Sequence, residues 1–249
     1  MKSNILKKSL FYSLTISVLS LSLSCFVPQN AFSANTKAPI QNEQKANTTN
    51  PADVEVLKKA SLAYQEKKYT EAINLLKPLA DKGNTDAQFA LGLIYVRGEG
   101  VKADPNLVKE YWTKSANAGH PEAQFNLGMA YIRGIFGKRS ATDAVKWWEK
   151  AANQGHGDAY YALGQIYKVG DGVKKDEKKS ASYNQKGLEL GHPGCAYELG
   201  VAYAKGAGVP KDMNKAKTLL KEAADKGDQV ALDVLKNIEK NSNTKNKKK

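Results

Sequence analysis

The chain has 249 residues, of which 41% are hydrophobic and 25% charged, and its formal net charge is +13. That apolar fraction excludes a chain that is disordered throughout, and the length suits one or two compact domains or one elongated repeat array. The charge is concentrated at the ends: residues 1–33 hold three lysines and residues 240–249 hold five, with no acidic residue in either segment. Residues 54–239 hold 28 basic and 23 acidic residues. A basic face for nucleic acid is therefore not indicated.

The first 33 residues have the pattern of an export signal. Three lysines precede an apolar stretch, and Ala31 and Ser33 place small residues at the −3 and −1 positions of a cleavage site before Ala34. We therefore expect a cleaved signal peptide over 1–33 and a protein that acts in the periplasm or outside the cell. Two alternatives stay open: an uncleaved membrane anchor, and a lipoprotein signal in which Cys25 is lipidated.

Two polar segments flank the part of the chain that can build a core. Residues 34–53 are rich in Asn, Thr and Gln, with few apolar side chains, and they predict a disordered linker. Residues 240–249 contain only Lys, Asn, Ser and Thr, and they predict a basic disordered tail.

A period of 36 residues organises the chain between these segments. Several residue types recur at this spacing without a gap, and repetition at a fixed period of this length is the signature of a repeat array. The columns are Leu91-Gly92, Leu127-Gly128, Leu163-Gly164 and Leu199-Gly200; Tyr95, Tyr131, Tyr167 and Tyr203; Gly98, Gly134, Gly170 and Gly206; and Gly83, Gly119, Gly155, Gly191 and Gly227.

Each unit predicts a pair of helices. Ala123, Leu127, Gly128 and Tyr131 share one helical face, and Gly134 ends that helix as a C-terminal cap. The second helix begins at a column of good N-cap residue types, which are Asp104, Ser140, Asp176 and Asp212.

The pattern A-x-x-x-L-G-x-x-Y-x-x-G-x-G-V, followed by Asp and then W-x-x-K-A-A-x-x-G, resembles the Sel1-like repeat, a relative of the tetratricopeptide repeat. The resemblance implies an all-α fold, a right-handed α-solenoid of antiparallel helix pairs with a concave groove. The expected order is a tetratricopeptide-like helix pair over 54–85, Sel1-like repeats over 86–121, 122–157, 158–193 and 194–229, and a C-terminal capping helix over 230–239.

Three kinds of residue invite a catalytic or metal-binding interpretation. His120, His156 and His192 lie one per repeat in the turn before a helix, too far apart to share one ion, so we interpret them as turn residues. The Gly-x-Gly segments follow helices and lack the Lys-Ser/Thr of a phosphate loop. Cys195 replaces the alanine of its column and is expected to be a buried apolar residue.

Cysteine-rich relatives of the resembled family have been associated with β-lactam binding or hydrolysis, and they carry a disulfide in each repeat. This chain has one cysteine after residue 33, and the motif S-x-x-K occurs only from Ser242 to Lys245, in the expected tail. We expect no catalytic residue, no cofactor and no metal.

The expected groove carries two columns that suit a partner. By analogy with the tetratricopeptide superhelix, the first helix of each pair lines the concave side, and an extended peptide with apolar anchors and acidic residues would suit it. The aromatic column is Phe89, Phe125, Tyr161 and Tyr197, and the cationic column is Arg97, Arg133 and Lys205. The alternatives are that the aromatic column packs between repeats and that the cations form a solvated face.

One loop departs from the repeat. The second unit has Gly134-Ile135-Phe136-Gly137-Lys138-Arg139 where the others have Gly-x-Gly-Val. Ile135 and Phe136 are candidate partner-binding residues, because such deviations are where binding sites are found in regular arrays. Alternatively, Phe136 packs against a neighbouring repeat in place of the valine.

These features favour a non-enzymatic protein–protein interaction scaffold of the bacterial envelope or the secreted fraction, which binds a protein or peptide in its groove. Nucleic acid and small-molecule cofactors are not expected partners. Two alternatives are a binder of peptidoglycan or its peptide stems and a β-lactam-interacting hydrolase.

Overall fold

The computed structural model describes residues 50–246, with side chains as far as Lys240. The expected signal peptide over 1–33, Cys25 and residues 34–49 of the expected linker lie outside the described residues. Every regular element from residue 50 to residue 246 is an α-helix. No helix in this part of the chain is long and apolar enough to cross a membrane. The chain divides into two units at Leu75 and Leu76.

The first unit contains α2 (Pro51–Gln65) and the start of α3 (Tyr69–Asp81). Helix α2 begins earlier than expected, inside the predicted linker, because Asn50 caps it through the backbone N–H of Ala52 and Pro51 suits the first helical position. A tight turn follows α2. There Lys67 adopts a φ of 60°, in the left-handed region that favours glycine.

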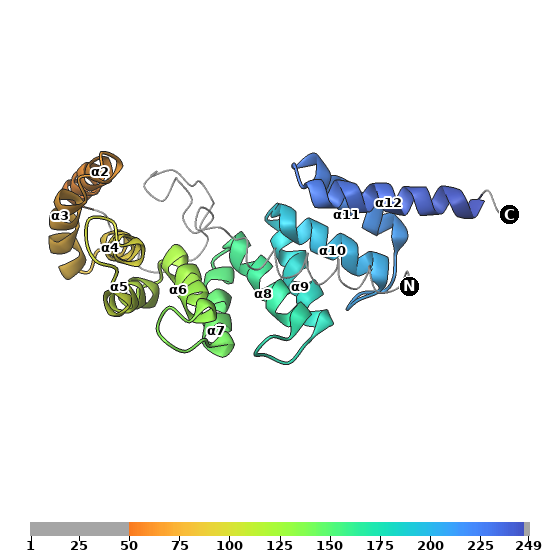
Figure 1. Ribbon diagram of the computed structural model, residues 1–249, viewed down its shortest axis with the longest axis horizontal. Helices are drawn as coiled ribbons and strands as arrows, with labels where there is room; N and C mark the ends of the chain where they lie inside the picture. Colours follow the sequence, from red (N-terminus) through yellow and green to blue (C-terminus); the bar gives the residue numbers. More distant parts are fainter. Residues whose placement is uncertain (1–49, 247–249) are drawn as a thin grey trace. The chain divides into compact units, whose positions relative to one another are not determined.

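In the second unit the helices follow one another as packed pairs. Each helix from α4 to α12 packs against the next (Figure 1). The pairs are α4 (Thr85–Arg97) with α5 (Pro105–Asn117), α6 (Pro121–Arg133) with α7 (Ala141–Ala152), α8 (Gly157–Val169) with α9 (Glu177–Glu189), and α10 (Pro193–Lys205) with α11 (Met213–Asp225); α12 (Gln229–Asn246) follows. The expected all-α solenoid of stacked helix pairs is confirmed.

The predicted caps explain where these helices begin and end. The side chains of Asp104, Ser140, Asp176 and Asp212 each accept a backbone N–H in the first turn of α5, α7, α9 and α11. Glycines with φ between 68° and 79° end the first helix of each pair, as expected of left-handed C-terminal caps: Gly98, Gly134, Gly170 and Gly206.

The glycine of the Leu-Gly pair lets the two helices of a pair approach closely. A Cβ at Gly92 would lie 2.2 Å from the Trp112 ring, and one at Gly128 would lie 2.5 Å from the Trp148 ring. Each indole also donates its Nε1–H to the backbone carbonyl of the facing helix, at 3.2 Å to Phe89 and 3.2 Å to the equivalent residue of α6. The tryptophan therefore packs directly on the backbone of the first helix.

The third pair fills the same position differently. Asn184 occupies the tryptophan column in α9, is buried against Gly164, and leaves its Oδ1 without a hydrogen-bond partner among the described residues. Leu220 occupies the column in α11 and is fully buried. The helix pairs are therefore stacked alike, but their cores are not equivalent.

The last helix covers the end of the array. Ala231 is buried, and three half-buried apolar residues of α12 (Val234, Leu235 and Ile238) pack against the same cluster. Lys236 and Glu239 of α12 stand at the positions equivalent to the glycine of the Leu-Gly pair and to the repeated tyrosine. Helix α12 therefore has polar residues where the first helix of each pair packs against its second helix.

The expected boundary of this capping helix at residue 239 is not observed, because α12 continues to Asn246. Residues 240–246 were expected to be disordered and are helical; no glycine or proline interrupts them.

Candidate functional site

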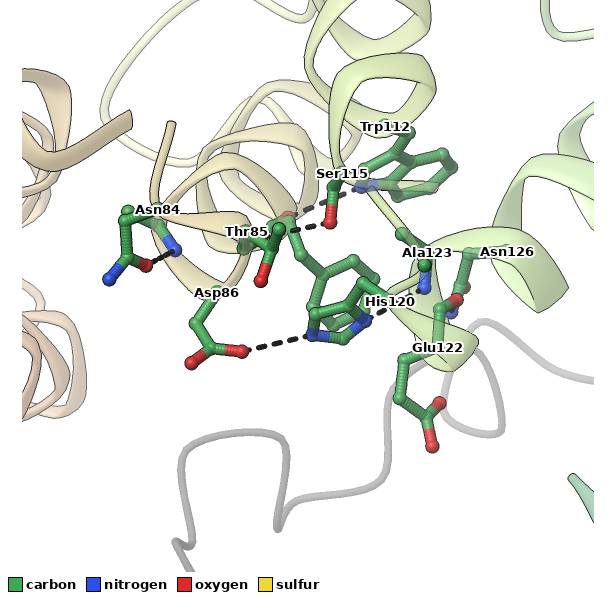
Figure 2. Close-up of polar contacts among 12 residues, drawn as sticks. Asn84, Thr85, Asp86, Trp112, Ser115, His120, Glu122, Ala123 and Asn126 are labelled. Atoms are coloured by element: carbon green, nitrogen blue, oxygen red, sulfur yellow. Dashed lines mark hydrogen bonds and ion pairs between the residues drawn. The ribbon is translucent and has the colours of Figure 1, made fainter. Parts of the chain in front are cut away.

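The most regular polar feature of the array lies where one repeat meets the next. His120 caps α6, because its Nδ1 accepts the backbone N–H of Ala123 at 3.2 Å. Its Nε2 lies 3.2 Å from the carboxylate of Asp86 on α4, and its ring lies 4.8 Å from the ring of Phe89. Figure 2 shows His120 between Asp86 and the N–H of Ala123. One histidine thus joins a helix cap, a carboxylate and an aromatic ring.

The same arrangement occurs at the next repeat. His156 accepts the backbone N–H of Ala159 at 3.3 Å, and its ring stacks on Phe125 at 4.6 Å. Its Nε2 lies 3.2 Å from the Glu122 carboxylate, although the two are not aligned as a hydrogen bond. The side chain of His156 is only 7% exposed.

His192 completes the set. It accepts the backbone N–H of Cys195 at 3.3 Å, its Nε2 lies 2.9 Å from the Asp158 carboxylate, and its ring stacks on Tyr161 at 5.1 Å. The hydrogen bond to His192, more than any other interaction, lowers the pKa of Asp158. We call these three arrangements the histidine junctions.

The histidines are turn residues, as the sequence predicted, but the sequence analysis missed their partners. A signal was present: acidic residues precede the histidines at a constant spacing, as Asp86, Glu122 and Asp158. The fourth member of that column is Gly194, and the residue that follows it at the same spacing is Asp228. No group of three or more His, Cys, Asp or Glu side chains able to hold a metal ion lies among the described residues.

Three members of the aromatic column, Phe89, Phe125 and Tyr161, lie at these junctions, and the exposure of the column is unequal. Phe89 is 5% exposed and is a packing residue, whereas Phe125, Tyr161 and Tyr197 are half-buried. Burial, with a smaller effect of Glu198, raises the pKa of Tyr161 to about 12. Phe89 therefore serves the contact between two repeats, whereas the rings of Phe125, Tyr161 and Tyr197 are partly accessible to solvent.

The cationic column is less uniform than its spacing suggested. Arg97 lies 3.5 Å from Glu99, while Arg133 and Lys205 are exposed near the ends of α6 and α10. In the third repeat the column holds Val169, which is also exposed.

A buried polar network lies beside the column, and the sequence analysis did not identify it. Glu198 on α10 is 7% exposed. One of its carboxylate oxygens accepts from Gln165 Nε2 at 2.6 Å and the other from Lys168 Nζ at 2.7 Å, both on α8. The network therefore links the first helices of two consecutive repeats.

The loop over 134–139 is fixed against its surroundings. Phe136 is half-buried and meets the Tyr131 ring edge-on at 5.3 Å, with Lys109 Nζ 5.8 Å from its centroid. Arg139 donates to both oxygens of Asp171, at 3.1 and 2.6 Å. These contacts favour the interpretation in which Phe136 packs against neighbouring residues, and Ile135 is also half-buried.

Cys195 is buried, and burial raises the pKa of its thiol to about 12, so it has the character of a small apolar residue that its column predicted.

A model of the Sel1 repeat matches residues 85–120, 121–156, 157–192 and 193–228, each one residue ahead of the expected boundaries. The chain belongs to the Sel1 repeat family. Repeats of this family commonly form protein-interaction scaffolds, and their proteins are typically non-enzymatic.

Solved structures agree with this family. A Sel1 repeat protein from Oxalobacter formigenes is 32% identical, with a TM-score of 0.62 over 68% of this chain and 49% of its own. A protective antigen of uropathogenic Escherichia coli with a Sel1-like repeat fold is 30% identical, with a TM-score of 0.67 over 70% of this chain and 38% of its own. This chain thus spans less than half the length of either relative. No curated protein matches it in sequence.

Proposed function

We propose that this Sel1 repeat protein is a non-enzymatic scaffold of the cell envelope or the secreted fraction. It binds a protein partner on the first-helix face, which we define by Arg133 on α6, Tyr161 on α8, and Tyr197 and Lys205 on α10. The envelope location rests on the export-signal pattern of residues 1–33 and on nothing in the described structure.

The network around Glu198 is the observation that carries this proposal. The equivalents of Glu198 in the other repeats are small or amide residues, Ala90, Asn126 and Ala162, and those of Gln165 are apolar, Leu93, Met129 and Val201. A buried ion pair is often no more stabilising than apolar residues of the same volume. Stability alone therefore does not explain why the array replaces its apolar pattern with hydrogen-bonding groups here.

The neighbouring residues determine which partner this face suits. Tyr161 and Tyr197 are half-buried beside the network, so each offers an apolar ring edge with a hydroxyl group. Arg133 and Lys205 add exposed positive charge at the ends of α6 and α10. A segment with apolar anchors and acidic side chains complements both features, and each anchor that becomes fully buried contributes about 1.5–3 kcal/mol.

Affinity capture from an envelope extract tests the proposal with a charge reversal at the edge of the face. Lys205→Glu removes a cation from the first-helix face, and Lys186→Glu makes the same change on α9, a second helix, where the lysine is also exposed. We expect a defined protein to be retained by the wild type and by Lys186→Glu, and to be depleted with Lys205→Glu, all three being folded by circular dichroism.

The salt dependence of the same capture separates the alternatives. Binding to peptidoglycan through the lysines of 240–249 would weaken steeply as salt screens the charges, and it would not distinguish the two variants. Equal loss of the partner with both variants would reject the first-helix face as the site.

A further inference from the structure

We propose that the three histidine junctions make the repeat array sensitive to acid, because protonation of each imidazole removes a helix cap at the contact between two repeats. This inference does not depend on the proposed function.

The cap fixes the position of the proton on each neutral ring. In all three junctions Nδ1 accepts a backbone N–H, from Ala123, Ala159 and Cys195. A ring nitrogen that accepts a hydrogen bond carries no proton, so the neutral imidazole holds its hydrogen on Nε2. Nε2 is the atom that faces a carboxylate in each junction. The geometry therefore requires the tautomer protonated on Nε2 at all three histidines.

A second proton has only Nδ1 to occupy. There it would confront the N–H that the ring caps, and the helix would lose its N-cap hydrogen bond. The imidazolium would also place a positive charge at the positive end of the helix dipole. His156 is almost fully buried, so a charge on its ring would in addition be poorly solvated.

The opposing effect is attraction to the carboxylates. The carboxylates that face the rings are Asp86 at His120, Glu122 and Asp158 at His156, and Asp158 at His192. Near His192, Lys226 also donates a hydrogen bond to the backbone carbonyl of Gly191. Glu198 and Asp228 lie close enough to the Tyr161 ring, which stacks on His192, to affect its pKa. Asp86 and Asp158 are 52% and 62% exposed, and ion pairs to solvated carboxylates contribute little. The attraction that opposes the loss of the cap is therefore weak at these two junctions.

The array itself contains caps that cannot respond in this way. Asn84 accepts the backbone N–H of Ala87 at 2.9 Å, and Asp228 accepts that of Ala231 at 3.0 Å, in the same column as the histidines. A cap at this position thus needs no imidazole, and the acidic partner is replaced by Gly194 where the cap is Asp228. Histidine and carboxylate occur together, which indicates a paired role.

Hydrogen exchange of single backbone amides tests the inference in the wild-type chain. Between pH 7.5 and pH 5.5, after correction for intrinsic rates, we expect the capped amides of Ala123, Ala159 and Cys195 to lose protection. Those of Ala87 and Ala231 serve as internal controls and should lose less. Equal changes at all five amides, or none, would overturn the proposal.

A matched variant gives a second readout. Replacing all three histidines by Asn copies the natural cap of Asn84 and removes the titrating group. If the native rings excluded the proton entirely, the unfolding equilibrium constant would rise by about tenfold per histidine over this pH range, as an upper limit. We expect a rise in the wild type and a much smaller one in the triple variant; the same rise in both, or imidazole nitrogen shifts that place a proton on Nδ1 at pH 7.5, would contradict the proposal.

Discussion

The contact between tryptophan and glycine inside a helix pair gives a quantitative prediction. In Gly128→Ala the new methyl group would lie 2.5 Å from the Trp148 ring and 3.0 Å from a backbone carbonyl of α7, so the indole has to shift. Overpacking of this kind costs about 1–3 kcal/mol, and weakening the hydrogen bond from Nε1 adds about 1 kcal/mol. The higher helix propensity of Ala returns about 1 kcal/mol. We expect a net destabilisation of about 1–3 kcal/mol.

Gly200→Ala is the matched control, because its methyl group would lie 3.0 Å from a side-chain carbon of Leu220, the residue that replaces the tryptophan. Here the propensity gain offsets most of the strain, and we expect a change within about 1 kcal/mol. Thermal or urea unfolding measures both, and about 2 kcal/mol corresponds to a shift in Tm of roughly 4–8 °C at this size. A Gly128→Ala protein as stable as Gly200→Ala would refute the close-packing argument.

Three further changes test other parts of the structure. Asn184→Leu, which copies Leu220, should raise stability by about 1–2 kcal/mol in urea unfolding, because it removes a buried amide oxygen without a partner; a lower midpoint would show that the amide is satisfied. Lys67→Gly should stabilise the first unit by about 1 kcal/mol, seen as slower proteolysis of α2, because it relieves a left-handed φ; faster cleavage would count against this. The raised pKa of Cys195 means that its thiol favours the folded state below the ordinary cysteine pKa, and that this contribution is lost between about pH 9 and pH 12. Cys195→Ala should therefore flatten the alkaline loss of stability, and an unchanged alkaline profile would contradict the assignment.

The sequence predicted the repeat because local rules determine most of it. Asp104 and Gly98 act through contacts with their own helix termini, so N-cap and C-cap chemistry could be inferred without knowing the packing. The position of α12 followed from its apolar residues, but its end did not, because Lys and Asn neither require a helix nor stop one.

The histidine junctions could not be derived in the same way. His120 and Asp86 meet because of the way consecutive repeats stack on one another. The 36-residue spacing shows which residues are equivalent, but it does not show which residue of one repeat contacts which residue of the next. The network of Gln165, Lys168 and Glu198 was missed for the same reason, since its members lie in three different columns. Deviations from the columns were therefore more informative about the candidate site than the columns themselves.

The unequal cores have a consequence for dynamics. Trp112 and Trp148 anchor the first two Sel1 pairs, whereas the third has Asn184 in that place and glycine at residue 187, where the other repeats have Ser115, Ala151 and Ala223. A repeat array is stabilised by the cores of its repeats and by their contacts with neighbours. We expect α9 to exchange its amide hydrogens faster than α7, because fewer apolar atoms are buried there.

Site-specific photo-crosslinking tests the central claim, that the first-helix face binds a protein, most directly. A photoreactive residue is placed at Arg133 on α6 or at Lys205 on α10, and for comparison at Lys186 on α9, all three being exposed positions. After irradiation in intact envelope material, the account predicts one crosslinked protein from the first two positions and none from the third. The same adduct from all three positions, or an adduct from residue 186 alone, would contradict it.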